Sequence, residues 1–209
     1  MIKEIKKEIV AGEELPVMEA FYTIQGEGMY QGVAAYFIRL GGCDVGCHWC
    51  DVKESWNADE HPVHTVNKLV SAVPTHVEMV VITGGEPLTW NMDKLTKALH
   101  EKGKRVHIET SGAYKVTGQW DWFCLSPKKR KLPTEKSYAL ANELKVIIYN
   151  KNDFVFAEEQ AAKVGPDCML LMQPEWSKRD VMTPLIVDYV KKNTKWRISL
   201  QTHKYIDVP

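Results

Sequence analysis

Three cysteines lie close together in the segment GCDVGCHWCD, which spans residues 42–51. Cys43, Cys47 and Cys50 follow the spacing Cys-x3-Cys-x2-Cys directly after a predicted strand. Thiolates this close in sequence can surround one soft metal centre. A 4Fe–4S cluster normally has four cysteine ligands, so a set of three leaves one iron open. The triplet therefore predicts a cluster that activates a bound molecule rather than one that only carries electrons.

A structural zinc site is the alternative interpretation of the triplet, with His48, His61 or His64 as the fourth ligand. Structural zinc sites usually combine two Cys-x2-Cys pairs, and this sequence contains a single pair. The other cysteines, Cys124 and Cys168, lie in apolar segments, where cysteine is most often a small buried hydrophobic residue. The pattern favours an iron–sulfur cluster over zinc.

Short β-branched runs alternate with helical patterns along the chain. The expected strands span residues 33–40, 79–83, 105–108, 121–125, 144–149, 169–173 and 196–200. The expected helices span residues 65–73, 92–101, 153–164 and 180–192. This alternation predicts an α/β fold with a mostly parallel sheet and crossover helices. A complete eight-fold barrel needs about 250 residues. The 209 residues therefore favour a single-domain partial (β/α) barrel, residues 1–209, with the cluster loop after the first barrel strand.

Charge and cysteine content limit the classes of function. Lys and Arg together number 27, as do Asp and Glu, so no strongly basic face for nucleic acid is expected. No apolar run approaches the ~20 residues of a membrane span. The charged residues 1–8 lack the apolar core of a signal peptide. A cytoplasmic protein with a small-molecule substrate is expected, and in that compartment cysteines serve metal chemistry more often than disulfides.

Further motifs follow the later strands in the same order as the strands themselves. They are Gly84-Gly85-Glu86-Pro87, the segment 109–112 (ETSG), Ser126-Pro127-Lys128 and Gln173-Pro174, in addition to Trp49 before the last cysteine of the triplet. Together with the triplet, this series resembles the motifs of the radical S-adenosylmethionine superfamily. The resemblance implies that a reduced 4Fe–4S cluster cleaves S-adenosylmethionine, and that the resulting radical takes a hydrogen atom from a substrate.

The resemblance also implies which residues hold the cofactors. Cys43, Cys47 and Cys50 would ligate the cluster. The GGEP loop would bind the amino group of S-adenosylmethionine through backbone atoms, because glycine permits close approach. The residues with an implied role in binding S-adenosylmethionine are Trp49, Asp51, Gly84, Gly85, Glu86, Ser111, Ser126, Pro127, Lys128 and Gln173.

The segment before the first barrel strand is more specific. Residues 21–28 (FYTIQGEG) resemble the F-x-T-[IL]-Q-G-E-G opening of the 7-carboxy-7-deazaguanine synthase family, and residues 50–56 and 201–209 are also similar to that family. The family converts 6-carboxy-5,6,7,8-tetrahydropterin to 7-carboxy-7-deazaguanine and ammonia, on the way to deazapurines such as queuosine. The planar guanidinium of Arg39 suits the carboxylate of that substrate. The implied substrate-binding residues are Ile24, Gln25, Gly26, Glu27, Arg39, Thr83 and Pro209.

One position departs from the family pattern. The family usually places Thr or Ser directly after the Cys-Asp pair, and that hydroxyl ligates Mg²⁺, whereas this sequence has Val52. Valine offers a hard cation no oxygen ligand. The resemblance still implies Mg²⁺ as a cofactor. Either the substrate, water, Asp51 or Ser55 holds the ion, or the dependence on the metal is reduced.

Other functions fit parts of the pattern. A glycyl-radical enzyme activase uses the same triplet at a similar length, but it acts on a protein partner, which the opening at residues 21–28 does not suggest. A non-enzymatic iron–sulfur or zinc scaffold would release no 5′-deoxyadenosine. An RNA-modifying enzyme is disfavoured because the sequence contains no basic auxiliary domain. The resemblance further implies an external one-electron reductant, such as flavodoxin or ferredoxin, and a homodimer.

Overall fold

The computed structural model describes residues 11–209, and the charged segment 1–8 lies outside the described residues. The strands are β1 (Glu14–Ile24), β2 (Ala34–Leu40), β3 (Val63–Thr65), β4 (Met79–Gly84), β5 (Arg105–Thr110), β6 (Trp122–Leu125), β7 (Glu143–Ile148), β8 (Met169–Pro174) and β9 (Trp196–Ile198). The α-helices are α2 (Val66–Ala72), α3 (Asp93–Glu101), α4 (Glu135–Leu140), α5 (Asn152–Ala161), α6 (Arg179–Lys192) and α7 (Thr202–Ile206). Short 3₁₀ helices span Lys53–Trp56, Ala58–Glu60, Pro87–Thr89 and Trp176–Lys178.

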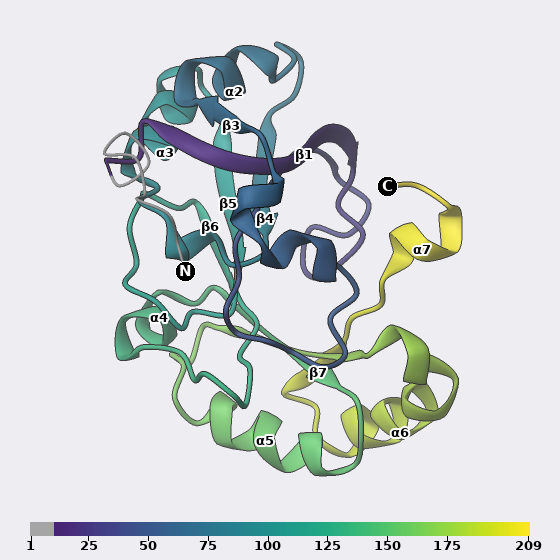
Figure 1. Cartoon of the computed structure of the whole chain (residues 1–209). Helices are drawn as coiled ribbons and strands as arrows, with labels where there is room; N and C mark the ends of the chain where they lie inside the picture. Colours follow the sequence, from purple (N-terminus) through teal and green to yellow (C-terminus); the bar gives the residue numbers. More distant parts are fainter. Residues whose placement is uncertain (1–10) are drawn as a thin grey trace.

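The strands form one nine-stranded sheet in the order β3-β1-β2-β4-β5-β6-β7-β8-β9 (Figure 1). From β2 to β9 every neighbouring pair is parallel. β1 pairs antiparallel with both β2 and β3. The sheet begins at β3 and ends at β9, so the barrel is open. The prediction of an α/β partial barrel with mostly parallel strands is confirmed.

The predicted strands and helices are all present, with ends that shift by no more than a few residues. Thr65 caps α2, as its position before the helical pattern indicates, because its side chain accepts a hydrogen bond from the Lys68 amide. The sequence patterns do not predict β1, β3, α4 or α7. β1, β3 and α7 lie outside the repeating strand–helix units, and α4, between β6 and β7, has 6 residues, too few to show a helical period.

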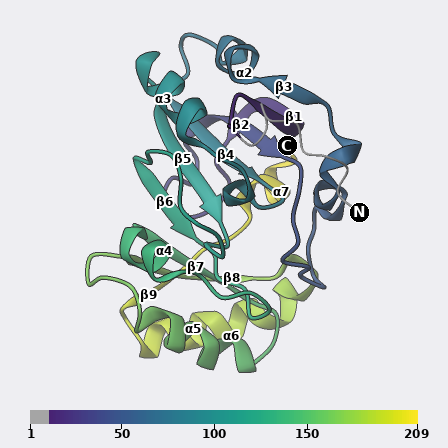
Figure 2. The ribbon, with the colours of Figure 1, turned by 60° about the vertical axis from the view of Figure 1, so that its left-hand side comes forward.

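Two apolar layers hold the helices on the outer face of the sheet. Ile82 of β4 packs with Leu95 of α3 in one layer. Val146 of β7 packs with Phe156 of α5 and Ile186 of α6 in the other. Figure 2 shows α5 and α6 beside β7, β8 and β9, with α2 and α3 toward the other end of the sheet. Since side chains alternate along a strand, the intervening residues point to the inner side of the open barrel.

Within residues 11–209, no helix combines the length and the apolar character that crossing a membrane requires.

Candidate active site

A pocket of about 390 Å³ opens at the carboxyl ends of the parallel strands. Its walls come from the loop after β1, the cluster loop after β2, the loops after β4, β5, β6 and β8, and the C-terminal segment. Every site residue predicted from the sequence lines this pocket except Pro127, and Val52 lines it too. Pro127 is buried, although Ser126 and Lys128 on either side reach the pocket, because successive side chains of an extended segment point to opposite sides.

The cluster loop is held against the GGEP loop by backbone hydrogen bonds. The amide of Gly85 donates to the carbonyl of Leu40 at 2.9 Å, and the amide of Glu86 donates to the carbonyl of Gly42 at 2.8 Å. A side-chain carbon on Gly84 would lie 2.2 Å from the Leu40 carbonyl oxygen, and one on Gly85 would lie 2.3 Å from the Gly42 carbonyl oxygen. The close approach of the two loops therefore requires both glycines.

The three thiols of the triplet all face the pocket and are partly exposed. The amide of Cys50 donates to the carbonyl of Cys47 at 3.1 Å, which forms a tight turn within the loop. Cys124 and Cys168 are buried and do not line the pocket. Cys168 packs in the apolar layer, as predicted, whereas the thiol of Cys124 donates a hydrogen bond to Oε1 of Glu143 at 3.3 Å, so the prediction that Cys124 is a small hydrophobic residue is only partly right. A set of three partly exposed thiols on one loop fits a 4Fe–4S cluster, whose ligands bind separate irons.

The histidines named for a zinc site are not grouped with the thiols. His61 Nε2 lies 2.8 Å from the carbonyl oxygen of Glu54, and the ring of His48 packs edge-on against Tyr149. His64 lies on β3, in register with Leu15 of β1. Across residues 11–209, His, Cys, Asp and Glu side chains do not converge in groups of three as a single zinc ion requires.

The carboxylate of Glu86 is buried and is bonded entirely within the protein. Oε1 accepts from the Leu88 amide at 3.0 Å and from the Thr110 hydroxyl at 2.5 Å. Oε2 accepts from the Ser111 amide at 2.8 Å and from the Ser111 hydroxyl. Glu86 thus ties the loop after β4 to the loop after β5, and the backbone of the loop is left to face the pocket.

A lysine projects into the pocket next to the cluster loop. Lys128 Nζ donates to the Ser126 carbonyl at 2.8 Å and to the Ser126 hydroxyl at 2.6 Å. It also lies 5.4 Å from the ring centroid of Trp49. Burial lowers the pKa of the Lys128 ammonium. The basic run at residues 128–131 therefore contributes one side chain to the pocket rather than only a solvated surface.

Arg39 reaches the pocket from β2, in register with Thr83 of β4. Its Nε donates to Oε1 of Glu19 at 2.6 Å, and its side chain is 20% exposed. The ion pair fixes the orientation of a guanidinium that has further N–H donors. Arg39 is thus both an ion-paired strand residue and a residue that lines the pocket.

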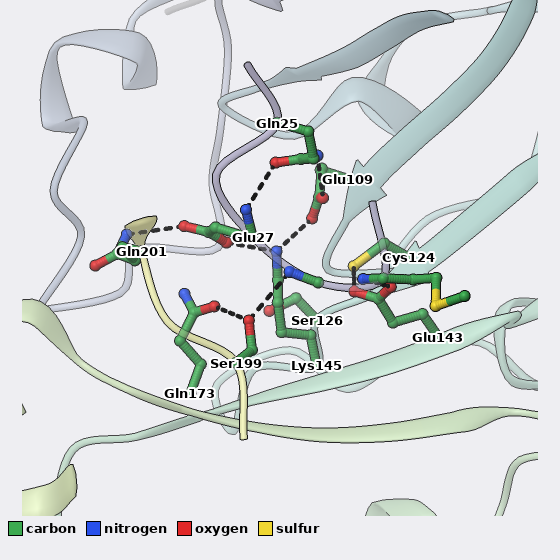
Figure 3. Close-up of polar contacts among 12 residues, drawn as sticks. Gln25, Glu27, Glu109, Cys124, Ser126, Glu143, Lys145, Gln173, Ser199 and Gln201 are labelled. Carbon is green, nitrogen blue, oxygen red and sulfur yellow. Dashed lines mark hydrogen bonds and ion pairs between the residues drawn. The ribbon is translucent and has the colours of Figure 1, made fainter. Parts of the chain in front are cut away.

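The floor of the pocket holds a charged residue, Lys145, that the sequence motifs do not identify. Lys145 of β7 contacts both Glu27, from the loop after β1, and Glu109 of β5 (Figure 3). Burial would raise the pKa of Glu27, but the Lys145 ammonium and neighbouring hydrogen bonds lower it to about 2. The pKa of Glu109 is raised, because burial and the nearby carboxylates of Glu143 and Glu27 together outweigh the effect of the Lys145 ammonium. The signal in the sequence that could have identified this group is the lysine within the apolar run at residues 144–148. A lysine buried in such a run requires a charged partner.

The C-terminal segment closes one side of the pocket. The Thr202 amide donates to the Gly26 carbonyl at 2.8 Å, and the Thr23 hydroxyl donates to the Pro209 carbonyl oxygen at 3.1 Å. Lys204 Nζ lies 2.6 Å from Oδ2 of Asp51, next to the last cysteine of the triplet. Gln201, His203 and Lys204 line the pocket as well, although the motifs single out only Pro209 in this segment.

The fold and the pocket define a member of the radical S-adenosylmethionine superfamily, and residues 37–116 match the family description "Radical SAM superfamily". The chain is 63% identical over 209 residues to the 7-carboxy-7-deazaguanine synthase of Flavobacterium psychrophilum, with all of both chains covered. It is 52% identical over 194 residues to that of Synechocystis sp., covering 92% of this chain and 93% of the relative. The chain therefore belongs to the 7-carboxy-7-deazaguanine synthase family.

A solved structure supports the same assignment. The crystal structure of QueE from Escherichia coli superposes with a TM-score of 0.82 at 30% sequence identity, covering 97% of this chain and all of the other. The superposition thus covers far more of the chain than residues 37–116.

Proposed function

We propose that the chain is a radical S-adenosylmethionine lyase that converts 6-carboxy-5,6,7,8-tetrahydropterin to 7-carboxy-7-deazaguanine and ammonia, in the biosynthesis of deazapurines such as queuosine. One observation carries the proposal. The cysteine triplet, the GGEP loop and the Gln25-Gly26-Glu27 loop line the same pocket in a chain whose full length matches a synthase. The reaction takes place in the cytoplasm, in a single domain formed by residues 1–209.

The residues around the triplet fit the two cofactors. Cys43, Cys47 and Cys50 would hold a 4Fe–4S cluster, and the backbone at Gly85 would receive the amino group of S-adenosylmethionine. When bound, the cluster and S-adenosylmethionine supply a radical that removes hydrogen from the substrate. The chain itself binds, orients and shields the reactants from water. The side chains proposed to bind S-adenosylmethionine around this backbone are Trp49, Asp51, Ser111, Ser126, Lys128 and Gln173.

The opposite wall of the pocket fits a pterin carboxylate. Glu27 keeps its negative charge, so its oxygens can accept hydrogen bonds from the N–H groups of a pterin ring. Arg39 would pair with the carboxylate of the substrate, with Thr83 beside it. Ile24, Gln25 and Gly26 would contact the ring through backbone and amide groups, and Pro209 would close over it.

An anaerobic assay tests the proposed function. The protein with a reconstituted cluster, a reductant and S-adenosylmethionine is given 6-carboxytetrahydropterin, and the products are read by mass spectrometry. Formation of 7-carboxy-7-deazaguanine is the expected result. Release of 5′-deoxyadenosine without that product would support the radical chemistry and reject the substrate. An intact cluster with neither product would favour a scaffold.

Replacement of Arg39 by alanine is expected to weaken use of the pterin while leaving slow, unproductive cleavage of S-adenosylmethionine. Loss of a hydrogen-bonded charge pair costs about 1.5–3 kcal/mol, which is roughly a 10- to 100-fold rise in KM for the pterin. Steady-state kinetics and the yield of 5′-deoxyadenosine without substrate measure the two effects. The matched control is Glu19→Gln, which breaks the ion pair and keeps the guanidinium. If Arg39→Ala fails to assemble the cluster, Arg39 is structural.

The side chains after Cys50 do not form a Mg²⁺ site. Val52 has no side-chain oxygen, and the hydroxyl of Ser55 is buried and donates to the Val52 carbonyl at 2.7 Å. The carboxylate of Asp51 is already paired with the ammonium of Lys204. The residues present therefore do not fit the metal that the family resemblance implies, and the proposed activity has a reduced dependence on Mg²⁺.

Replacement of Val52 by threonine is expected to increase stimulation by Mg²⁺, because the new hydroxyl would supply a hard oxygen ligand. Even groups that only orient the ligands change metal affinity by roughly 10- to 100-fold, so with a direct ligand added the Mg²⁺ concentration for half-maximal activity should fall by about tenfold or more. Product formation is titrated with Mg²⁺ after treatment with a chelator. Val52→Ala is the matched control, since it alters packing without adding oxygen. Equal responses of the two variants would remove position 52 from any metal site.

Family membership supports two further parts of the proposal. The enzyme takes single electrons from an external reductant such as flavodoxin or ferredoxin, and it acts as a homodimer. Turnover with each reduced protein and light scattering of the cluster-loaded enzyme would test these expectations.

A further inference from the structure

Lys145 is a buried lysine that points from β7 into the open barrel. Its neighbours Leu144 and Val146 are buried in the apolar layer on the outer face of the sheet. Only 4% of its side chain is exposed, although the residue lines the pocket. An ammonium so deeply buried is costly unless it is paired and hydrogen-bonded. The contacts that offset this cost are with two carboxylates, and they indicate the role of the lysine.

Lys145 Nζ lies 2.5 Å from Oε2 of Glu27 and 2.8 Å from Oε2 of Glu109. The other carboxylate oxygens bind amides: Oε1 of Glu27 accepts from Gln201 at 2.9 Å, and Oε1 of Glu109 lies 3.4 Å from Nε2 of Gln25. Gln25 in turn accepts from the Glu27 amide at 3.1 Å. These contacts close a ring from Lys145 through Glu109, Gln25 and Glu27 back to Lys145 (Figure 3).

The ring joins a loop to the barrel. Glu27 and Gln25 belong to the loop after β1, and Glu27 is 118 residues away from Lys145 in the sequence. Glu109 and Lys145 belong to β5 and β7, whose positions the parallel sheet fixes. The only cation in the ring is Lys145, so without it two carboxylates would face each other in a poorly solvated space. Like charges at short range repel strongly there.

The charge of Lys145 does not depend on ordinary changes in pH. Burial would lower the pKa of its ammonium, but the surrounding groups, Cys124, Glu109, Glu27 and Glu143, hold that pKa well above its usual range. The lysine is therefore a permanent cation, and Glu27 beside it stays negatively charged.

We propose that Lys145 is a positioning residue, which holds Glu27 and the loop at residues 25–27 in the geometry that receives the N–H edge of the substrate before the substrate arrives. This role rests on the proposed function, because it assigns the loop to pterin binding. Lys145 acts through Glu27 and Glu109. Each carboxylate oxygen has two acceptor sites, so an oxygen bound to Lys145 can still receive a substrate donor.

The first test replaces Lys145 by methionine, which keeps the length of the side chain and removes its charge. The expected result is a rise in KM for 6-carboxytetrahydropterin of roughly 10- to 100-fold, the range for a lost charged hydrogen bond. The cluster content, and 5′-deoxyadenosine release without substrate, should stay close to those of wild type, because Lys145 Nζ is bonded to Glu27 and Glu109 and not to the cluster loop. The control is Lys195→Met, which breaks an exposed lysine–glutamate pair outside the pocket and should leave KM unchanged.

The second test separates positioning from charge balance. The double variant Lys145→Met/Glu109→Gln restores the net charge of the group, since it removes one positive and one negative charge. If Lys145 positions the loop, KM for the pterin remains high in the double variant. A return of KM to the wild-type value would show that the lysine only neutralises charge, and would overturn the proposal. So would an unchanged KM in Lys145→Met, or failure of both variants to give folded, cluster-loaded protein.

The wild-type enzyme in the same assay distinguishes this proposal from the proposed function. If the wild type makes no 7-carboxy-7-deazaguanine, the function and the role that rests on it are both rejected. If the wild type turns over the pterin and the variants match it, only the role of Lys145 is rejected.

Discussion

Replacement of Cys47 by alanine is expected to abolish the brown colour of the protein together with all formation of 5′-deoxyadenosine and 7-carboxy-7-deazaguanine. Cys47 lies between Cys43 and Cys50 in the sequence, and all three line the pocket. Two thiols cannot replace the set of three that leaves one iron open, so the cluster should not assemble. Absorbance spectra, iron and sulfide content and an anaerobic assay after reconstitution measure the loss.

Cys168→Ala is the matched control for this prediction. Cys168 is buried and does not line the pocket, so its replacement should cost roughly 1 kcal/mol of stability and should leave the cluster and the activity intact. Full activity in the Cys47 variant would reject the cluster assignment. Loss of the cluster in the Cys168 variant would show that cluster assembly also depends on a cysteine outside the triplet.

The central strands of the parallel sheet, β4, β6 and β7, were predictable because most of their residues are buried on either face. β4, for example, appears in the sequence as the continuous apolar run MVVIT at residues 79–83. β1 does not have this character. It contains Pro16 and Glu19, several of its residues are exposed, and its pairing with β2 shifts register between Val17 and Glu19. A register shift interrupts the alternation of polar and apolar residues that a half-exposed strand would otherwise show.

The part of the site that lies in loops at strand ends was predictable from the sequence. The triplet and the GGEP loop follow β2 and β4, and loops at the carboxyl ends of parallel strands meet on one side of the sheet. The pocket floor was not predictable in this way. Lys145 lies inside a strand, and its partners Glu109 and Glu27 are 36 and 118 residues away. Pairing at such separations is decided by tertiary packing rather than by local pattern.

The role of Glu86 illustrates the same limit within a motif. The GGEP pattern places this residue at the cofactor, and the residue does line the pocket. Only the structure reveals that both oxygens of its carboxylate accept hydrogen bonds from the backbone and hydroxyl groups of Leu88, Thr110 and Ser111. The acidic residue in the motif therefore stabilises the arrangement of two loops, and the glycines before it provide the close approach.

Replacement of Glu86 by glutamine is expected to destabilise the protein strongly and to weaken binding of S-adenosylmethionine. All the groups that contact the carboxylate donate hydrogen bonds, and the backbone amides of Leu88 and Ser111 cannot reverse their role. In either orientation, the NH₂ group of glutamine would face one of these amides. An unsatisfied buried donor costs about 1–3 kcal/mol, and more where a charged partner is lost. In a chain of this length, such a loss corresponds to a fall in Tm of roughly 5–10 °C.

Thermal unfolding of the Glu86→Gln variant and equilibrium binding of S-adenosylmethionine to the reconstituted protein measure the two effects. Glu158→Gln is the matched control, because its partners Tyr189, Lys195 and Trp196 contribute side-chain donors at a partly exposed position outside the pocket. Side chains can turn away where backbone amides cannot, so this control should lose less stability and should bind S-adenosylmethionine normally. If both variants lose the same stability and keep their affinity, the carboxylate of Glu86 does not hold the two loops in place, and the sequence GGEP serves the cofactor through another of its atoms.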